Sequence, residues 1–164
     1  MKKEISTQLT PDNIARVLAL LAATPDRLDA MARGDEEALR RPLDSGERSF
    51  AEVLAHLINT ESRSAESILL ALALDKPLLP PVHPERDYGV LLRHDLRPVI
   101  DSLAYFRYRR AVLLRLLQSL TEAQWSRTIQ EAGKQRRESV YWRARGMALH
   151  EAEHLAWLAA RPPQ

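Results

Sequence analysis

Residues 75–88, DKPLLPPVHPERDY, determine how two helices of this chain are connected, because four of these 14 residues are prolines. Proline lacks an amide hydrogen and clashes with the preceding helical turn, so we expect the segment to be extended rather than helical. At roughly 3.1 Å per residue, such a connector reaches about 43 Å. The segment therefore predicts a stiff crossover between two helices.

Two helices are predicted before the crossover. Thr10-Pro11-Asp12 combines an N-cap residue, a proline at the first helical position and an acid in the first turn, and Gly34 is a natural stop. Ser49-Phe50-Ala51-Glu52 is a capping box. Apolar residues then recur at helical spacing as far as Leu72, which indicates a second, longer helix.

Two more helices are predicted after the crossover. The third runs from near Asp95 to about Leu120, with Pro98 tolerated in its first turn, and a short extra turn follows at residues 121–125. A polar loop leads to the fourth helix, which ends before Arg161. No segment shows strand alternation or hairpin signals. We therefore expect an all-α four-helix bundle that forms a single domain over residues 1–164.

The length of the connector selects the topology of this bundle. The second helix, about 25 residues at 1.5 Å per residue, is only about 37 Å long, which is less than the reach of the connector. The connector can therefore pass the whole bundle and start the third helix at the same end as the second. This predicts the order up-down-down-up instead of simple alternation.

The composition limits the classes of partner. The chain has no cysteine, which excludes disulfides and thiolate metal sites and suits a reducing cytoplasm. The 24 basic and 22 acidic residues nearly balance, so the charge does not indicate nucleic-acid binding. No apolar run is long enough to span a bilayer, and the first 13 residues lack the apolar core of a signal peptide. We expect a cytoplasmic protein that binds neither nucleic acid nor membranes.

The sequence HEAEH at residues 150–154 matches the H-E-x-x-H pattern of zinc proteases. A protease of that kind needs a third ligand downstream, and no His, Asp or Glu follows His154. The protease interpretation is therefore disfavoured. His150 and His154 are nevertheless one helical turn apart, so their imidazoles can share one metal ion.

His56 is the candidate third ligand. It lies roughly 10 Å from the start of the second helix, and His154 lies roughly 9 Å from the end of the fourth. Because these helices run antiparallel in the crossover topology, both positions fall at one level of the bundle. Three neutral imidazoles leave coordination positions for water or substrate, as in catalytic sites. The alternative is three unrelated histidines that each cap or pair locally.

Charged residues near the motif are further candidates. Glu151 falls near the middle of the apolar stripe of the fourth helix, and we take it as the candidate catalytic residue: a hydrogen-bond acceptor for a ligand histidine or a general base. The alternative pairs it with an arginine across the bundle. Glu61 also faces inward and is expected to be a core partner. Five basic residues either attract an anionic substrate or form a solvated surface: Lys134, Arg136, Arg137, Arg143 and Arg145.

Three stretches carry a family resemblance: SFAEVLAHLINTESRSAESI (49–68), LLRLLQSLTEAQWSRT (113–128) and HEAEHLAWLA (150–159). In their order and spacing they resemble the DinB/YfiT-like superfamily of metal-dependent proteins. The resemblance implies an up-down-down-up bundle that forms a homodimer. It also implies a divalent metal ion bound by His56, His150 and His154, with zinc or nickel expected first and iron next.

The resemblance leaves two classes of function open. Relatives include metal-dependent transferases and isomerases that use low-molecular-weight thiols, which implies thiol transfer or hydrolysis on a small-molecule substrate. This chain lacks the separate C-terminal domain of the mycothiol-dependent isomerases, so no particular thiol is implied. The alternative is a non-catalytic, metal-stabilised helical bundle that acts as a binding or stress-response protein.

Overall fold

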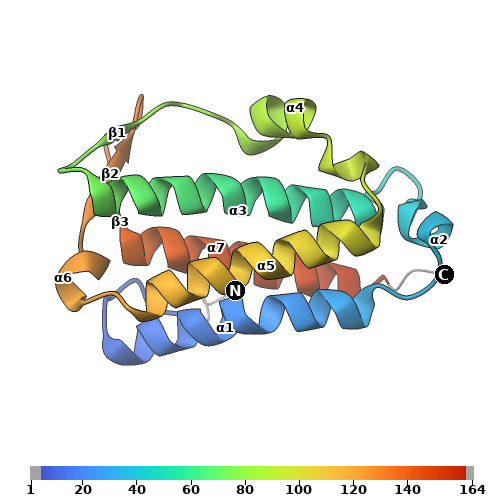
Figure 1. Ribbon diagram of the computed structural model, residues 1–164, viewed down its shortest axis with the longest axis horizontal. Helices are drawn as coiled ribbons and strands as arrows, with labels where there is room; N and C mark the ends of the chain where they lie inside the picture. Colours follow the sequence, from blue (N-terminus) through green and yellow to red (C-terminus); the bar gives the residue numbers. More distant parts are fainter. Residues whose placement is uncertain (1–4, 162–164) are drawn as a thin grey trace.

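Four long helices form a bundle in the computed structural model, which describes residues 5–161. Residues 1–4, part of the segment compared with a signal peptide, and residues 162–164 lie outside the described part. The helices are α1 (Pro11–Met31), α3 (Phe50–Ala73), α5 (Val99–Gln118) and α7 (Val140–Ala159). In Figure 1, α3 and α5 run in one direction and α1 and α7 in the other. The predicted up-down-down-up order is confirmed.

Three predicted helix starts are confirmed. The side chain of Thr10 accepts an amide hydrogen from the first turn of α1. Ser49 and Glu52 form the reciprocal capping box at the start of α3, with Glu52 Oε2 2.7 Å from the amide nitrogen of Ser49. The extra turn is α6 (Glu122–Trp125), which has its own capping box at Thr121. Local side-chain chemistry therefore determines where these helices begin.

The helix ends agree with the sequence to within a few residues. α7 ends at Ala159, before Arg161, as predicted. α1 ends at Met31, ahead of the predicted stop at Gly34, which lies in the following loop with φ of +100°. Glycine adopts this left-handed conformation without strain, so the signal marks the turn after the helix. Within the described residues, no helix combines the length and the apolar character that crossing a bilayer requires.

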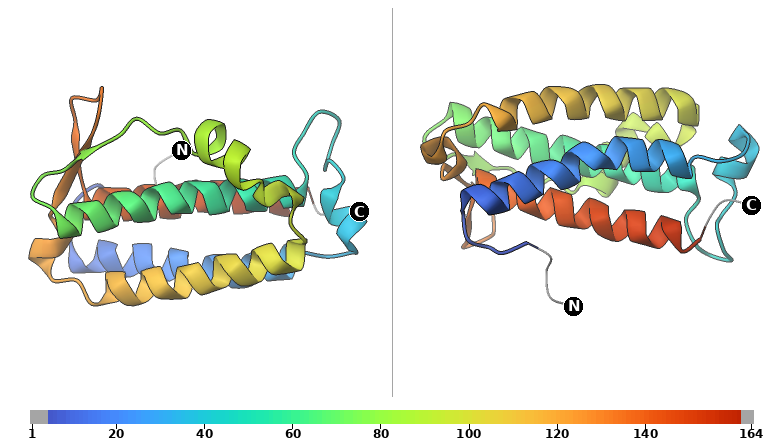
Figure 2. Two further views of the ribbon diagram at one scale, coloured as in Figure 1. Left: turned by 45° about the horizontal axis from the view of Figure 1, so that its top comes forward. Right: turned by 90° about the horizontal axis from the view of Figure 1, so that it is seen from below.

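The crossover is partly helical, and the prediction that residues 75–88 are wholly extended is wrong for the last part of the segment. It contains β1 (Leu78–Leu79), the π-helix η1 (Pro84–Gly89), α4 (Val90–Leu92) and the 3₁₀ helix η2 (His94–Leu96). Pro84 occupies the first position of η1, where a helix does not use the amide hydrogen. The imidazole of His83 accepts the amide hydrogen of Arg86 and so caps η1. The crossover still runs along α3 to the opposite end of the bundle (Figure 2).

A small sheet closes one end of the bundle, although no strand was predicted. β1 pairs in parallel with β2 (Thr128–Glu131), and β2 pairs antiparallel with β3 (Arg137–Ser139). Strands of two to four residues are too short to show the alternation that identifies a strand in a sequence. Leu79 and Ile129 are fully buried, so the sheet contributes to the core.

The short helix α2 (Glu36–Arg40), which the sequence did not indicate, caps the start of α5. The N-cap residue of α5 is Pro98, whose side chain cannot accept a hydrogen bond. The carboxylate of Glu36 accepts the amide hydrogen of Val99 instead, at 2.9 Å. A side chain distant in sequence thus replaces the missing local cap.

A polar layer divides the core into two apolar clusters, one beside the sheet and the other beside α2. On each long helix a buried polar side chain lies between members of the two clusters: Thr24, Glu61, Arg110 and Glu151. Buried charges require partners, so these four side chains are expected to contact one another.

Candidate metal centre

Three imidazole rings meet where α3 packs against α7. His56 comes from α3, and His150 and His154 come from consecutive turns of α7. Nε2 of His150 lies 3.1 Å from Nε2 of His56 and 3.1 Å from Nε2 of His154. All three candidate ligand atoms lie within 4.8 Å of one another. The structure thus brings the three predicted histidines to one level of the bundle.

The spacing of these nitrogens fits a divalent metal ion. With metal–nitrogen bonds of about 2.0–2.1 Å, ligand nitrogens lie about 3.3 Å apart in a tetrahedron and about 2.9 Å apart in an octahedron. The observed 3.1 Å falls between these values. A neutral ring nitrogen carries either one proton or one lone pair, so Nε2 of His150 cannot form good hydrogen bonds to both neighbours at once. A shared cation accommodates all three lone pairs.

The environment also keeps the rings in the state that binds a metal. Burial, with the nearby His150 and His56, lowers the pKa of His154 from 6.5 to about 4. Burial and the neighbouring His56 also lower the pKa of His150 below its ordinary value. Both rings are therefore neutral at neutral pH, and a neutral imidazole is the form that donates a lone pair to a metal.

Glu85 of η1 orients His56. Its Oε1 lies 2.8 Å from Nδ1 of His56. A carboxylate can only accept at this position, so Nδ1 carries a proton and Nε2 is the nitrogen of His56 that faces the other two histidines. Ligand histidines in metal sites commonly donate their second nitrogen to such a carboxylate. Glu85 is not among the predicted site residues, because an extended crossover would not place it on α3; the available signal is an acid directly after Pro84 at a helix start.

The close approach of η1 to α3 places this carboxylate. Nδ2 of Asn59, on α3, lies 3.4 Å from the same oxygen of Glu85. A Cβ atom at Gly89 would lie only 3.1 Å from Nδ2 of Asn59, so a glycine there lets the two helices approach. Turns of π-helix often occur at functional sites, and here the turn brings a crossover residue to the ligand set.

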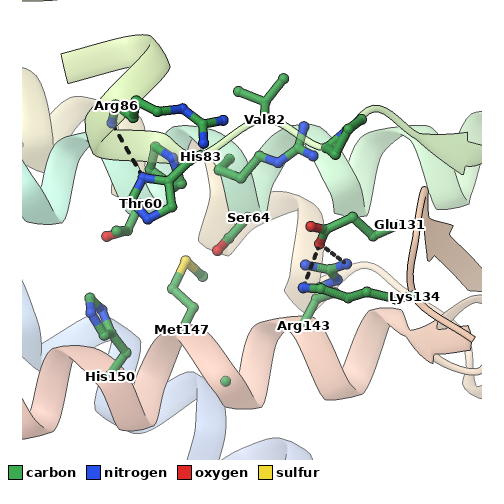
Figure 3. A pocket seen from close by; sticks show the side chains of 14 residues that line it. Thr60, Ser64, Val82, His83, Arg86, Glu131, Lys134, Arg143, Met147 and His150 are labelled. Carbon is green, nitrogen blue, oxygen red and sulfur yellow. Dashed lines mark hydrogen bonds and ion pairs between the residues drawn. The ribbon is translucent and has the colours of Figure 1, made fainter. Parts of the chain in front are cut away.

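A cleft of about 460 Å³ opens beside His150 (Figure 3). Helices α3 and α7 form its walls, and the crossover residues Val82 and His83 cover it. At the end away from His150, the carboxylate of Glu131 accepts a hydrogen bond from Lys134 and pairs with Arg143. A ligand in this cleft thus has the candidate metal centre at one end and the ion pairs of Glu131 with Lys134 and Arg143 at the other.

A second cleft, of about 420 Å³, lies on another side of the same histidines. Its lining residues are Arg48, Val53, His56, Glu153, His154 and Trp157. His150 lines the first cleft, whereas His56 and His154 line the second. The three histidines are therefore reached from two clefts.

Glu151 pairs with Arg110 in the polar layer of the core. Its Oε1 accepts from Nη2 of Arg110 at 2.6 Å, and its Oε2 accepts from Nη1 of Arg110 and from the hydroxyl of Thr24, both at 2.9 Å. This is the cross-bundle arginine pairing that the sequence left open as an alternative. Within the described residues, no hydrogen bond joins Glu151 to a histidine. A catalytic role for Glu151 therefore stays a prediction.

Arg110 also contacts two other groups, the carbonyl of Leu21 and the carboxylate of Glu61. Pro25 of α1 has no amide hydrogen, so the carbonyl of Leu21 lacks its helical partner, and Nη1 of Arg110 donates to that carbonyl at 2.8 Å. Nε of Arg110 lies 3.6 Å from Oε1 of Glu61. Burial raises the pKa of Glu61 from 4.5 to about 7; Arg110 opposes this rise and the charge of Glu151 adds to it.

The five basic residues singled out in the sequence have separate surroundings. Lys134 and Arg143 line the first cleft. Arg136 stacks on an indole ring, with its guanidinium 3.6 Å from the ring centre. Arg145 is buried and donates to the carbonyl of Ile5. The carbonyl of Lys76 accepts a hydrogen bond from Arg137.

Comparisons with known proteins identify the family of this chain. A family model described as the DinB superfamily matches residues 16–158. This chain belongs to the DinB superfamily. The solved structure of YfiT from Bacillus subtilis, described as a probable metal-dependent hydrolase with an unusual four-helix bundle topology, is similar with a TM-score of 0.83. The two chains are 17% identical, over 96% of this chain and 90% of that one.

A comparison of the DinB chain with curated protein sequences gives no match. At 17% identity, the likeness to YfiT shows a shared fold. The ligand set of this DinB protein is therefore argued from its own geometry, namely three converging Nε2 atoms and the carboxylate behind one of them.

Proposed function

We propose that this DinB-family chain is a divalent-metal-dependent enzyme that acts on a small molecule, with hydrolysis as the first candidate reaction. The observation that supports the proposal is the convergence of three imidazole nitrogens at a place that two clefts reach. Three protein ligands leave coordination positions for water and substrate, whereas structural sites have four. A divalent cation, when bound, supplies Lewis acidity. YfiT, described as a probable metal-dependent hydrolase, has the same fold.

The protein side chains hold and orient the reacting groups. His56, His150 and His154 would hold the cation, and Glu85 fixes the ring of His56 by accepting its Nδ1 hydrogen. His150 and His154, whose pKa values are lowered, need not lose a proton at neutral pH before they bind the ion. Imidazole ligands suit zinc, nickel and iron, so these are the candidate ions. Zinc and nickel are the first candidates and iron is the next.

The first cleft favours a particular shape of substrate. Its reacting group would lie beside His150, and an acidic group would meet a lining in which basic side chains outnumber the one carboxylate, that of Glu131. The basic side chains are those of Arg63, Arg86, Lys134 and Arg143. The thioether of Met147 lies between the two ends of the cleft and offers apolar contact (Figure 3). This arrangement supports a small, acidic organic molecule as the substrate.

Group transfer from a low-molecular-weight thiol is the second candidate, and the second cleft favours it. Transfer requires two substrates at one centre, and the clefts reach the histidines from different sides. The chain has no cysteine, so a thiol nucleophile would have to enter as a co-substrate. Trp157 in the second cleft offers an aromatic surface for the acceptor.

The first experiment measures metal content by elemental analysis of protein purified without a nickel column. Wild type is compared with His150→Ala and His83→Asn. His83→Asn removes an imidazole outside the ligand set and keeps a residue able to cap η1. We expect near-stoichiometric metal in wild type and His83→Asn and a loss in His150→Ala. Wild-type protein that is metal-free and does not bind added zinc or nickel would contradict the proposal.

The second experiment distinguishes the reactions. Metal-loaded protein is assayed with acidic esters and amides, and separately with small acidic thiols plus an electrophile, with His150→Ala as the control. Turnover of one substrate alone supports hydrolysis, whereas turnover that requires both thiol and electrophile supports transfer. Stoichiometric metal without turnover in either assay would support the non-catalytic, metal-stabilised bundle.

A further inference from the structure

A glycine lies in the interior of α7, where the first cleft opens. Gly146 is exposed and lines this cleft beside Met147. Glycine is less stable than alanine in a helix interior, and a Cβ atom at this position would meet nothing within 4 Å. Alanine would therefore fit here and stabilise the helix. The glycine keeps open a space over α7 that the described side chains do not fill, and this space is available to a ligand.

The cleft residues of α7 form a straight path to the candidate metal centre. Gly146 and Met147 are each three or four residues from Arg143 and from His150, so all four lie on one side of the helix. At 1.5 Å per residue, Arg143 and His150 are roughly 10 Å apart along the helix. A ligand that contacts both ends of the cleft therefore lies over Gly146 and has the length of about three extended residues.

The carboxylate of Glu131 stands at the end of this path away from His150. It is half-buried and points from β2 into the cleft (Figure 3). Burial acts to raise the pKa of Glu131, but Lys134 and Arg143 outweigh it and hold this pKa below its ordinary value. Both cations contact Oε2, and within residues 5–161 no hydrogen bond reaches Oε1. An ionised oxygen with free lone pairs suits a donor on the ligand, above all an ammonium group.

The two cations beside Glu131 keep hydrogen-bond donors for a carboxylate. Lys134 has three ammonium hydrogens and donates one of them to Glu131, and its side chain is 58% exposed. Arg143 directs Nη2 at Glu131 and Nε at Glu138, and its Nη1 has no partner in the described part of the chain. An exposed ion pair contributes little to stability, so a ligand can rearrange it at a small cost. A ligand that carries an ammonium next to a carboxylate thus finds partners for both.

An ammonium and a carboxylate on one carbon atom form the head of an α-amino acid. We propose that the first cleft binds such a free α-amino acid head, with its ammonium on Glu131. Its carboxylate contacts Lys134 and Arg143. The side chain of the ligand extends over Gly146 toward His150. This inference rests on the proposed function, because the group that reacts is the far end of that side chain, and it narrows the substrate to amino acids extended at the side-chain end.

The first test is binding to metal-free protein, measured by NMR titration, so that the result depends neither on the metal nor on turnover. The probe is Nε-acetyl-lysine, an α-amino acid with an amide at the end of its side chain. Two analogues have the same chain length: 6-acetamidohexanoate lacks the ammonium, and N-acetylcadaverine lacks the carboxylate. Each analogue is expected to bind about tenfold more weakly than the probe or worse, because one charge-assisted hydrogen bond is lost. Equal binding of the three compounds, or no binding of any of them, would overturn the inference.

The second test uses variants of the cleft with the same three compounds. Glu131→Gln should remove the preference for Nε-acetyl-lysine over 6-acetamidohexanoate, because the charge that holds the ammonium is gone. Glu138→Gln is the matched control and should keep the preference, since Glu138 also pairs with Arg143 but does not line the cleft. Gly146→Leu should weaken binding of the probe roughly tenfold or more and leave the Tm and the zinc content at least as high as in wild type, since leucine is the better helix former. An unchanged preference in Glu131→Gln, or unchanged affinity in Gly146→Leu, would contradict the arrangement.

Turnover separates this inference from the proposed function. Hydrolysis of Nε-acetyl-lysine consumes one water molecule and releases acetate and lysine, which can be measured with metal-loaded protein. Wild type that binds the probe with the expected preference but releases no acetate would support the inference and count against hydrolysis of this amide. Release of acetate from 6-acetamidohexanoate as fast as from the probe would support hydrolysis and overturn the inference.

Discussion

Oε1 of Glu85 lies 2.8 Å from Nδ1 of His56, so the crossover between α3 and α5 supplies part of the candidate metal centre. The connector that determines the topology therefore also determines the orientation of a ligand. The carboxylate of Glu85 accepts the hydrogen on Nδ1 of His56, and this hydrogen bond makes the ring a stronger donor to a cation.

Removing this carboxylate should weaken metal binding without abolishing it. Glu85→Ala is expected to raise the dissociation constant for zinc roughly 10- to 100-fold, because His56 loses the group that selects its tautomer. Glu85→Gln keeps an acceptor oxygen and should lie between wild type and Glu85→Ala. Glu153→Ala is the control, since Glu153 lines the second cleft without a hydrogen bond to the described histidines. Competition titration with a chromogenic chelator gives the constants, and equal values for Glu85→Ala and Glu153→Ala would contradict the role.

Metal binding should stabilise the folded chain, because the ligand histidines come from α3 and α7 and meet only when the bundle forms. Zinc at about 100 times its dissociation constant should add about 2.7 kcal/mol to the free energy of unfolding. For a domain of this size, that corresponds to a rise in Tm of roughly 5–10 °C. Differential scanning calorimetry should detect the rise in wild type and His83→Asn and its absence in His154→Ala. The same rise in all three proteins would mean that zinc binds elsewhere.

The sequence predicted the helices and their order because the responsible signals are local. The caps at Thr10, Ser49 and Thr121 act within a few residues, and the proline connector has a calculable reach. The level of the three histidines followed from that order. The short strands β2 and β3 were not predictable, since pairing with β1 and burial of Ile129 are tertiary effects.

The surroundings of the site were less predictable because they depend on contacts distant in sequence. Glu85 reaches His56 only because the crossover folds into a π-helix on α3. Arg110 was not singled out, although Pro25 inside α1 implied a carbonyl in need of a donor. Which side chain would supply that donor could not be read from spacing, because α1 and α5 are far apart in the sequence.

The buried carboxyl of Glu61 should make stability depend on pH. Its pKa is raised on folding from 4.5 to about 7, so folding favours the protonated form. The associated stability is fully present below about pH 4.5 and is lost as the pH rises through about 7, a difference of about 3 kcal/mol. Glu61→Gln resembles the protonated form and should be more stable than wild type at pH 8 but not at pH 5. Urea unfolding at both pH values measures this, with the exposed Glu37→Gln as control; parallel behaviour of the two variants would contradict the assignment.

Because Glu151 pairs with Arg110, a structural role and a catalytic role of Glu151 predict different results for its variants. Glu151→Ala leaves Arg110 without its two-point partner and Thr24 without an acceptor, so the free energy of unfolding should fall by about 3–5 kcal/mol. Metal affinity should change only a few-fold, because Glu151 makes no described hydrogen bond to a ligand histidine. Glu151→Gln keeps the shape but removes the charge, which leaves Glu61 as the acidic partner of Arg110, so the pKa of Glu61 should fall below about 7. Chemical denaturation, chelator competition and carboxyl-carbon NMR measure these three quantities. A Glu151→Gln protein with wild-type stability, metal content and Glu61 titration, but without activity, would instead assign Glu151 to catalysis.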